Sequence, residues 1–479
     1  MSGLNNIDHV IVLMLENRSF DNLLGGLYPS GPDFNGLTGN ETNPYDVPGG
    51  VTEIIQVWSD AGVDQQTLTT PTPDPGELYP DIAQQIFADQ TPGKQVPTMQ
   101  GFANNYAKHG GKARDIMHYF QPAQVPVLSE LARSFAVCDQ WYASAPCQTW
   151  PNRFFLHTGT ANGYPNNSPQ HFPYTMNTIF NVLGDAGVEW KIYFNDFPQS
   201  LTLSKLWPHL HRFRPYADFQ SDAKTGKLPA YTFIEPRFFT DLALPNDQHP
   251  PHDVTFGEQL IADVYNHVRT SPCWEKSLLI IIYDEHGGIY DHAPPPLAVT
   301  PDSKADAAFA FDRYGVRIPA VLVSPYIKAG TILRSAPDGL AHQGPPYPFD
   351  HTSVIATLRK RFGIVKPLTQ RDAVAPSVDN VLNLDSPSNK GPDKINIPPC
   401  EFTPAQLQAA KDAPANDFQK AAFEAMSLLP VVPSWTGELR VLESLFRTFI
   451  NKLTGKSAAL AKAGDAASAI KAKVDGFLP

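Results

Sequence analysis

The sequence has few cysteines, few charged residues and no long hydrophobic run. Its four cysteines, Cys138, Cys147, Cys273 and Cys400, form no CxxC or Cys/His pattern typical of structural zinc. A chain of 479 residues can bury a sizeable core without a disulfide framework, although one bridge between Cys138 and Cys147 stays open. Charged residues make up 18% and apolar residues 42%, which excludes a disordered chain or a coiled coil.

The longest apolar runs, residues 10–15 and 278–283, are far shorter than the roughly 20 residues that cross a membrane. The N-terminus shows no basic region, cleavage site or twin arginine. We therefore expect no standard signal peptide, and either a cytoplasmic protein or export by a specialised secretion route. A peripheral membrane contact is compatible with both.

Positive charge is also scarce. Lys and Arg number 37 against 48 Asp and Glu, a net charge of −11. A broad basic surface for nucleic acid is therefore missing, and we expect no nucleic-acid partner. An anionic substrate would need a local positive centre, such as a metal ion.

Proline is abundant, with 47 scattered residues. Residues 25–100 are rich in Pro, Gly, Thr and Asp and are expected to form long loops over the core. Apolar runs at 10–15, 278–283 and 320–323 predict strands buried on both faces, and amphipathic patterns such as 257–268 predict helices between them. This alternation predicts an α/β fold with a doubly wound, mostly parallel central sheet and helices on both faces. Ligands of such sheets bind beyond the carboxyl ends of the strands.

The composition changes after about residue 398, where Ala and Lys become frequent. We predict a catalytic domain at 1–398 and a helical C-terminal extension at 399–479. Within the extension, apolar residues fall at helical spacing on one face between 439 and 453. This stripe needs a partner: the main domain, a second copy of the chain in a homo-oligomer, or a membrane.

Acidic side chains follow two of the predicted strands. Glu16 and Asn17 offer two oxygen donors for a cation, although they would also suit a helix cap. Asp284 and Glu285 would repel each other in a buried crevice unless a cation were present, and a solvated loop is the alternative.

Two further segments carry histidines that could bind metal or transfer protons, or simply lie on surface loops. The segment 246–253 holds Asp247, His249 and His252, and the segment 349–353 holds His351.

A hydroxyl nucleophile is sought because no cysteine has a suitable neighbour. Thr149 precedes Pro151 at the expected start of a helix, whose N-terminus would attract a phosphate. Arg153 could add a bidentate phosphate contact. Taken alone, Thr149 is better explained as a helix N-cap.

Together these segments resemble a family of phosphoesterases within the alkaline-phosphatase superfamily. This family comprises phosphatidylcholine-preferring phospholipases C, non-specific phospholipases C and related acid phosphatases. The matching segments follow the family's order between residue 7 and about 375: residues 16–21, 74–76, 149–153, 249–251, 284–288 with 291–292, and 317–319 with 324–325.

The resemblance implies roles for particular residues. Thr149 would be the nucleophile and His249 the general acid. The metal ligands would be Glu16, Asn17, Asp284 and Glu285. Further residues would serve a second metal or the substrate: Glu77, His118, Arg153, His211, Asp247, His252, His286, His292 and His351. Glu77 departs from the family, which has histidine there, and His118 stands where many relatives have glycine.

The resemblance implies a metal-dependent phospholipase C. It would convert phosphatidylcholine-type lipids to diacylglycerol and a phosphorylated headgroup through a phosphothreonine intermediate. An acid phosphatase acting on phosphomonoesters is the first alternative, and an inactive, metal-stabilised binding or oligomerising protein is the second. One or two divalent ions are expected. Nearby histidines favour Zn²⁺, while oxygen ligands also admit Mg²⁺, Mn²⁺ or Ca²⁺.

Overall fold

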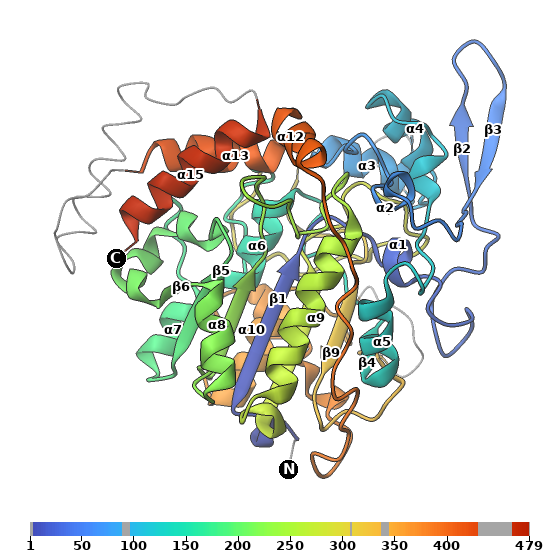
Figure 1. Cartoon of the computed structure of the whole chain (residues 1–479). Coiled ribbons are helices and arrows are strands. Elements are labelled where there is room, and N and C mark those ends of the chain that lie inside the picture. Colours follow the sequence, from blue (N-terminus) through green and yellow to red (C-terminus); the bar gives the residue numbers. More distant parts are fainter. Residues whose placement is uncertain (1–2, 89–95, 307–308, 337–343, 430–461, 479) are drawn as a thin grey trace.

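A computed structural model describes residues 3–88, 96–306, 309–336, 344–429 and 462–478. Its centre is an eight-stranded sheet in the order β10-β4-β9-β8-β1-β7-β5-β6 (Figure 1). The strands are β1 His9–Leu15, β4 Ala136–Cys138, β5 Trp190–Phe194, β6 Phe213–Pro215, β7 Tyr231–Glu235, β8 Ser277–Tyr283, β9 Ala320–Val323 and β10 Thr331–Leu333. Only β9 runs antiparallel to its neighbours in this sheet. The predicted mostly parallel sheet is confirmed.

The central strands β1 and β8 are almost wholly buried, because helices cover both faces of the sheet. They pair in parallel, with Leu15 opposite Tyr283. This register places the residues that follow the two strands, Glu16 and Asp284, at the same edge of the sheet. The fold thus brings together two predicted ligands that lie far apart in the sequence.

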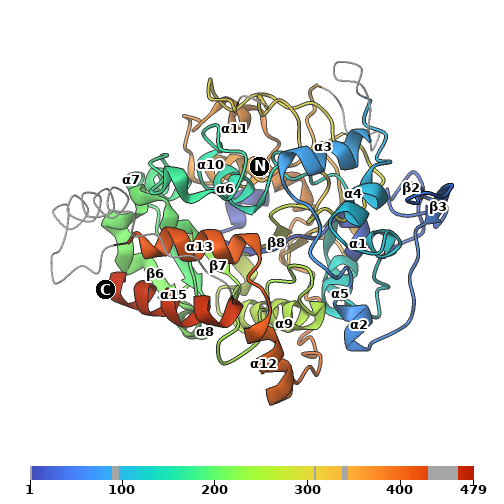
Figure 2. The ribbon, with the colours of Figure 1, turned by 90° about the horizontal axis from the view of Figure 1, so that it is seen from above.

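Helices α5, α8 and α9 lie on one face of the sheet, and α6, α7 and α10 lie on the other (Figure 2). Their bounds are α5 Pro126–Ser134, α6 Thr149–Thr158, α7 Ile179–Asp185, α8 Tyr216–Lys224, α9 Val254–Thr270 and α10 Thr352–Phe362. The chain also forms α1 Phe20–Leu24, α4 Phe102–Lys108, α11 Gln370–Val374 and several short 3₁₀ helices, of which η5 spans Ser204–Arg212.

The expectation of long loops at 25–100 was wrong in part. An antiparallel hairpin forms from β2 Thr42–Asp46 and β3 Thr52–Gln56, followed by α2 Gln65–Leu68 and α3 Tyr79–Phe87. Proline is tolerated in β2 because this two-stranded ribbon consists of edges only. In α3, proline stands in the first turn, where no intrahelical N–H bond is lost.

The C-terminal extension is helical as predicted. It contains α12 Pro404–Asp412, α13 Asp417–Ser427 and α15 Ala463–Phe477. Phe418 of α13 packs against Phe238 of the main domain, with ring centroids 4.7 Å apart. The apolar stripe at 439–453 lies outside the described residues, so its partner and the domain boundary at 398 remain predictions.

The four cysteines are free thiols, so the alternative of a Cys138–Cys147 bridge is wrong. Within the described ranges, no helix is both long enough and apolar enough to cross a membrane.

One buried carboxyl group, Glu258 of α9, caps a neighbouring helix. It accepts hydrogen bonds from the backbone N–H groups of Val127 and Leu128, which have no partner within α5. Burial raises the pKa of Glu258 from its ordinary value of 4.5 to about 8. The folded state therefore favours the protonated carboxyl.

We predict that the free energy of unfolding falls as pH rises from about 4.5 to about 8, because the unfolded chain releases this proton first. Glu258→Gln keeps an acceptor oxygen without the charge, and should flatten this part of the profile. Denaturant unfolding of both proteins across this pH range measures the difference. If the free energy of unfolding of both proteins changed with pH in the same way, the assignment of this pH dependence to Glu258 would be wrong.

Candidate active site

Three buried carboxylates at the ends of strands surround one guanidinium group. Arg153 of α6 lies 3.2 Å from Oε1 of Glu16, 3.4 Å from Oδ2 of Asp284 and 3.9 Å from Oε2 of Glu235. All four side chains are fully buried. Burial alone would lower the pKa of Arg153, but the charges of Glu16 and Asp284 raise it. Arg153 therefore stays charged.

This one cation does not compensate all the acidic oxygens. Both carboxylate oxygens of Glu16, Oδ2 of Asp284 and Oε1 of Glu285 are buried without a hydrogen-bond partner. Burial raises the pKa of all three residues, since no solvent stabilises their charges. A divalent ion would supply the missing partner, and carboxylate oxygens suit it chemically. Among the described residues, however, these three carboxyl groups do not form a set whose ligand atoms all lie within 4.8 Å of one another, whereas Asp21, Asp291 and His292 do.

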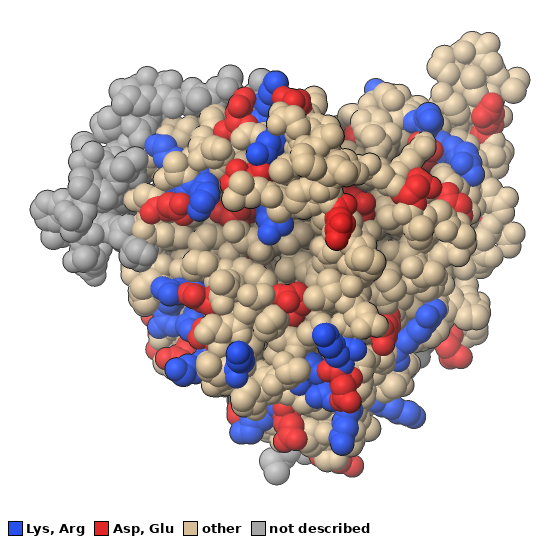
Figure 3. Space-filling view, in the orientation of Figure 1, with Lys and Arg blue, Asp and Glu red and all other residues tan. Residues whose placement is uncertain are grey.

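The face of the molecule seen in Figure 3 does not supply this positive charge. Basic and acidic side chains are interspersed on the face seen in Figure 3, with no continuous basic area. A phosphate group would therefore have to find its positive partners inside the site.

Asn17 connects the acidic centre to the predicted nucleophile. Its backbone N–H donates to Asp284 (2.9 Å), and its Nδ2 donates to Glu77 (2.5 Å). The Thr149 hydroxyl donates to its Oδ1 across 3.4 Å. Asn17 has a φ of +56°, a left-handed conformation that asparagine tolerates. Gly287 allows the β8 loop to approach, because a Cβ there would lie 2.3 Å from the Asn17 carbonyl oxygen.

Thr149 is the first residue of α6, and Gln148 is its N-cap. The alternative of Thr149 as the N-cap is therefore wrong. Its hydroxyl faces Asn17 rather than the backbone of its own helix. The N-terminus of a helix is favourable for a phosphate group.

Glu77 lies in a second cluster, with Asp74 and His249. One ligand atom of each side chain lies within 4.8 Å of the others, an arrangement compatible with a divalent metal. The Nδ1 of His249 is 2.6 Å from the carbonyl oxygen of Pro250, so it must donate, and Nε2 carries the lone pair in the neutral ring. Burial lowers the pKa of His249 to about 4. Its Nε2 lies 3.8 Å from Glu77.

Asp247 and His252 support this region. Asp247 accepts from Nδ1 of His252 (2.6 Å) and from the backbone N–H of His249 (3.0 Å). Its carbonyl oxygen accepts from the backbone N–H of Glu16. Asp247 therefore connects the acidic centre at Glu16 to the cluster that contains His249 through backbone contacts.

Two predicted histidines border the acidic pair. The Nδ1 of His286 is 3.2 Å from Glu285, and its Nε2 is 2.8 Å from Oε1 of Gln85. The Nε2 of His351 donates to the Asp284 carbonyl oxygen (2.6 Å), so it orients the ligand backbone.

Three predicted histidines lie in other surroundings. His292 pairs with Asp21 (2.7 Å) in a network neutralised by Arg317. His118 is buried between aromatic rings, and His211 is exposed on η5 beside another histidine ring. No contact in the described part of the chain joins these three to Thr149.

Sequence reasoning missed three residues of this region. Glu235 closes β7 just as Glu16 and Asp284 follow β1 and β8, so its position at a strand end was a usable signal. Asp74 stood in a recognised segment, but it was not assigned as a ligand. Arg18 donates to the carbonyl oxygens of Gln248 (2.7 Å) and Thr70 (2.8 Å), which only the folded chain reveals.

Comparison with known proteins identifies the family. A model of the phosphoesterase family matches residues 7–365. The chain belongs to the phosphoesterase family. This phosphoesterase is 37% identical over 439 residues to non-specific phospholipase C1 of Arabidopsis thaliana, covering 88% of this chain and 79% of that protein. It is 38% identical over 444 residues to non-specific phospholipase C6 of the same plant, covering 88% and 81%.

Among solved structures, a protein in the alkaline phosphatase superfamily from Vibrio parahaemolyticus matches 52% of this phosphoesterase and 64% of its own chain. The TM-score is 0.32 and the identity 14%. The family match confirms the resemblance seen in the sequence and identifies the chain as a phosphoric ester hydrolase.

We predict that Arg153→Met destabilises the phosphoesterase by about 3–5 kcal/mol, because buried carboxylates lose their positive partner. A divalent cation should restore part of this loss by binding the same oxygens. Denaturant unfolding with a chelator and with added metal measures both effects, and Arg153→Lys is the control that keeps the charge. A loss below about 1 kcal/mol would show that Arg153 is not the main charge partner.

Proposed function

We propose that this phosphoesterase is a phospholipase C that hydrolyses phosphatidylcholine-type lipids. The observation that carries the proposal is the buried Thr149 hydroxyl at a helix N-terminus, held by Asn17 beside unpartnered carboxylate oxygens. The names of the similar plant proteins support a phospholipid as the substrate.

In the proposed reaction, the Thr149 oxygen attacks phosphorus, and the bond from phosphorus to the glycerol oxygen breaks. The hydroxyl proton passes to the carboxylate of Glu77, which accepts a hydrogen bond from Nδ2 of Asn17. The departing alkoxide takes a proton and becomes diacylglycerol. Water then hydrolyses the phosphothreonine and releases the phosphorylated headgroup.

We assign the proton transfer to the leaving group to His249. Its Nδ1–H is fixed on the carbonyl of Pro250, so Nε2 is the atom that can carry the proton. Glu77 lies 3.8 Å from Nε2 and can hold that proton or return it. In the free protein the ring is neutral, so it must be protonated before it acts as the acid.

Glu16, Asn17, Asp284 and Glu285 would hold a divalent ion. Such an ion would lower the pKa of the Thr149 hydroxyl and neutralise phosphate charge. The histidines nearby favour Zn²⁺, and the oxygen-rich ligand set also admits Mg²⁺, Mn²⁺ or Ca²⁺. A second ion held by Glu77, Asp74 and His249 would occupy Nε2 of His249, so it is the alternative to His249 acting as the acid.

Membrane contact would be peripheral and would last only while substrate is taken up. Homo-oligomerisation through the C-terminal helices, and a cytoplasmic or specially exported location, remain predictions.

Replacement of Thr149 by alanine should lower turnover at least about 10³-fold, because the attacking oxygen is lost. Thr149→Ser retains a hydroxyl and should keep measurable turnover. Release of phosphocholine from phosphatidylcholine gives the rate, and mass spectrometry of acid-quenched enzyme should find phosphate on Thr149. Undiminished turnover in the alanine variant would end the nucleophile assignment. Faster release of phosphate from p-nitrophenyl phosphate would favour the acid phosphatase.

Dialysis of the holoenzyme against a chelator should abolish activity and lower the midpoint of thermal unfolding, because the acidic oxygens lose their counter-charge. Elemental analysis before and after dialysis identifies the ion and its stoichiometry. Asp284→Asn should lower the bound metal, whereas Asp393→Asn, at an exposed surface ion pair, should not. Full activity in a metal-free preparation would contradict the proposal.

A further inference from the structure

A pocket of about 1110 Å³ adjoins the site, slightly larger than the about 300–1,000 Å³ usual for small-molecule pockets. Glu77 and Asp74 line its inner part, and Glu77 contacts Asn17, which contacts Thr149. A ligand in this pocket is therefore close to the proposed nucleophile. Proton transfer and phosphate binding do not require a cavity of this size.

The outer wall of the pocket comes from the C-terminal extension. Ala405 and Ala409 of α12 and Asn416 and Lys420 at α13 line it. Small side chains along α12 leave the cavity open beneath the helix. This part of the chain lies beyond residues 7–365, the span matched by the family model.

Contacts on three sides hold this wall in place. Nε2 of Gln406 donates to Oε1 of Gln65 on α2 (3.0 Å), so α12 bridges the pocket. Gln259 of α9 donates to the carbonyl oxygen of Pro398 (2.8 Å), just before α12. Gln419 of α13 donates to the Phe238 carbonyl oxygen (2.9 Å).

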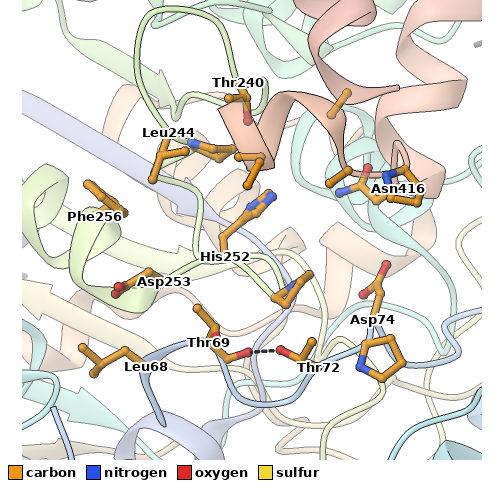
Figure 4. Close-up of a pocket in the computed structure, with 18 of the residues that line it drawn as sticks. Leu68, Thr69, Thr72, Asp74, Thr240, Leu244, His252, Asp253, Phe256 and Asn416 are labelled. Atoms are coloured by element: carbon orange, nitrogen blue, oxygen red, sulfur yellow. Dashed lines mark hydrogen bonds between the residues drawn. The ribbon is translucent and has the colours of Figure 1, made fainter. Parts of the chain in front are cut away.

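The lining of the pocket is amphiphilic. Figure 4 shows Leu68, Leu244 and Phe256 on one side, with Asp253 between Phe256 and Leu68, and Asp74 and Asn416 on the other. Glu77 also lines the pocket. A molecule with a polar phosphate end and an apolar body fits this division, whereas a small charged ester would leave the apolar side unfilled.

We propose that this pocket binds the diacylglycerol portion of a phospholipid, and that α12 confers the preference for lipids over small phosphate esters. The proposal rests on the proposed phospholipase C function. It adds residues that determine specificity without touching the reacting atoms.

The test introduces a larger side chain on α12 that would fill the pocket. Ala409→Trp places a large ring in the cavity, and Gln408→Trp is the matched control, because Gln408 is an exposed neighbour that does not line the pocket. The two substrates are phosphatidylcholine in detergent micelles and p-nitrophenyl phosphorylcholine, which has the same headgroup without acyl chains. For Ala409→Trp we expect kcat/KM to fall at least about tenfold with the lipid and to stay within about twofold with the small ester. Gln408→Trp should change neither rate.

Equal losses on both substrates would overturn the proposal, since the pocket would then bind the shared headgroup or serve the fold. An unchanged lipid rate would also overturn it. If the wild-type protein hydrolyses neither substrate, the proposed function fails while the pocket is still tested. Calorimetry with water-soluble dihexanoylglycerol should then show binding to the wild type and the Gln408→Trp variant, and none to Ala409→Trp. Equal binding to all three, or to none, would refute the assignment.

Discussion

The parallel register of β1 and β8 is the constraint on which the site depends. Because Leu15 lies opposite Tyr283, the acidic residues after both strands leave the sheet together. Hydrogen bonds along the two strands fix this register, and a shift of one residue would turn apolar side chains away from their packing partners. The high cost of burying several like charges is thus borne by the most rigid part of the molecule.

Arg153 would neutralise part of the negative charge of these carboxylates, and a metal ion would neutralise the rest. Arg153 stays charged, and its guanidinium lies over the Phe238 ring, 5.2 Å from the ring centroid. One guanidinium does not neutralise all of these carboxylates. The remaining negative charge would favour a cation at the oxygens that lack a hydrogen-bond partner.

Much of this arrangement followed from sequence because it rests on local patterns. Continuous apolar runs predicted β1 and β8, and the acidic residues after them predicted the centre. The roles of Arg153 and Asn17 within it depend on contacts across 130 or more residues, which no local pattern encodes. His118 and His211 show the limit of local patterns: histidine is a common ligand, but aromatic stacking and surface exposure suit it equally well. His292 pairs with Asp21, and Asp21, Asp291 and His292 also form a group that could hold a metal ion. The hairpin at β2 and β3 was hidden by proline, whose cost is small in an isolated ribbon.

The bridge from Gln406 to Gln65 joins positions separated by most of the chain. During synthesis, the reactive side chains up to Glu285 emerge from the ribosome before α12 exists. A nascent or truncated chain could therefore assemble its chemical centre while the cavity beside it lies open to water. The packing of α12 onto the folded domain would then add one wall to this cleft.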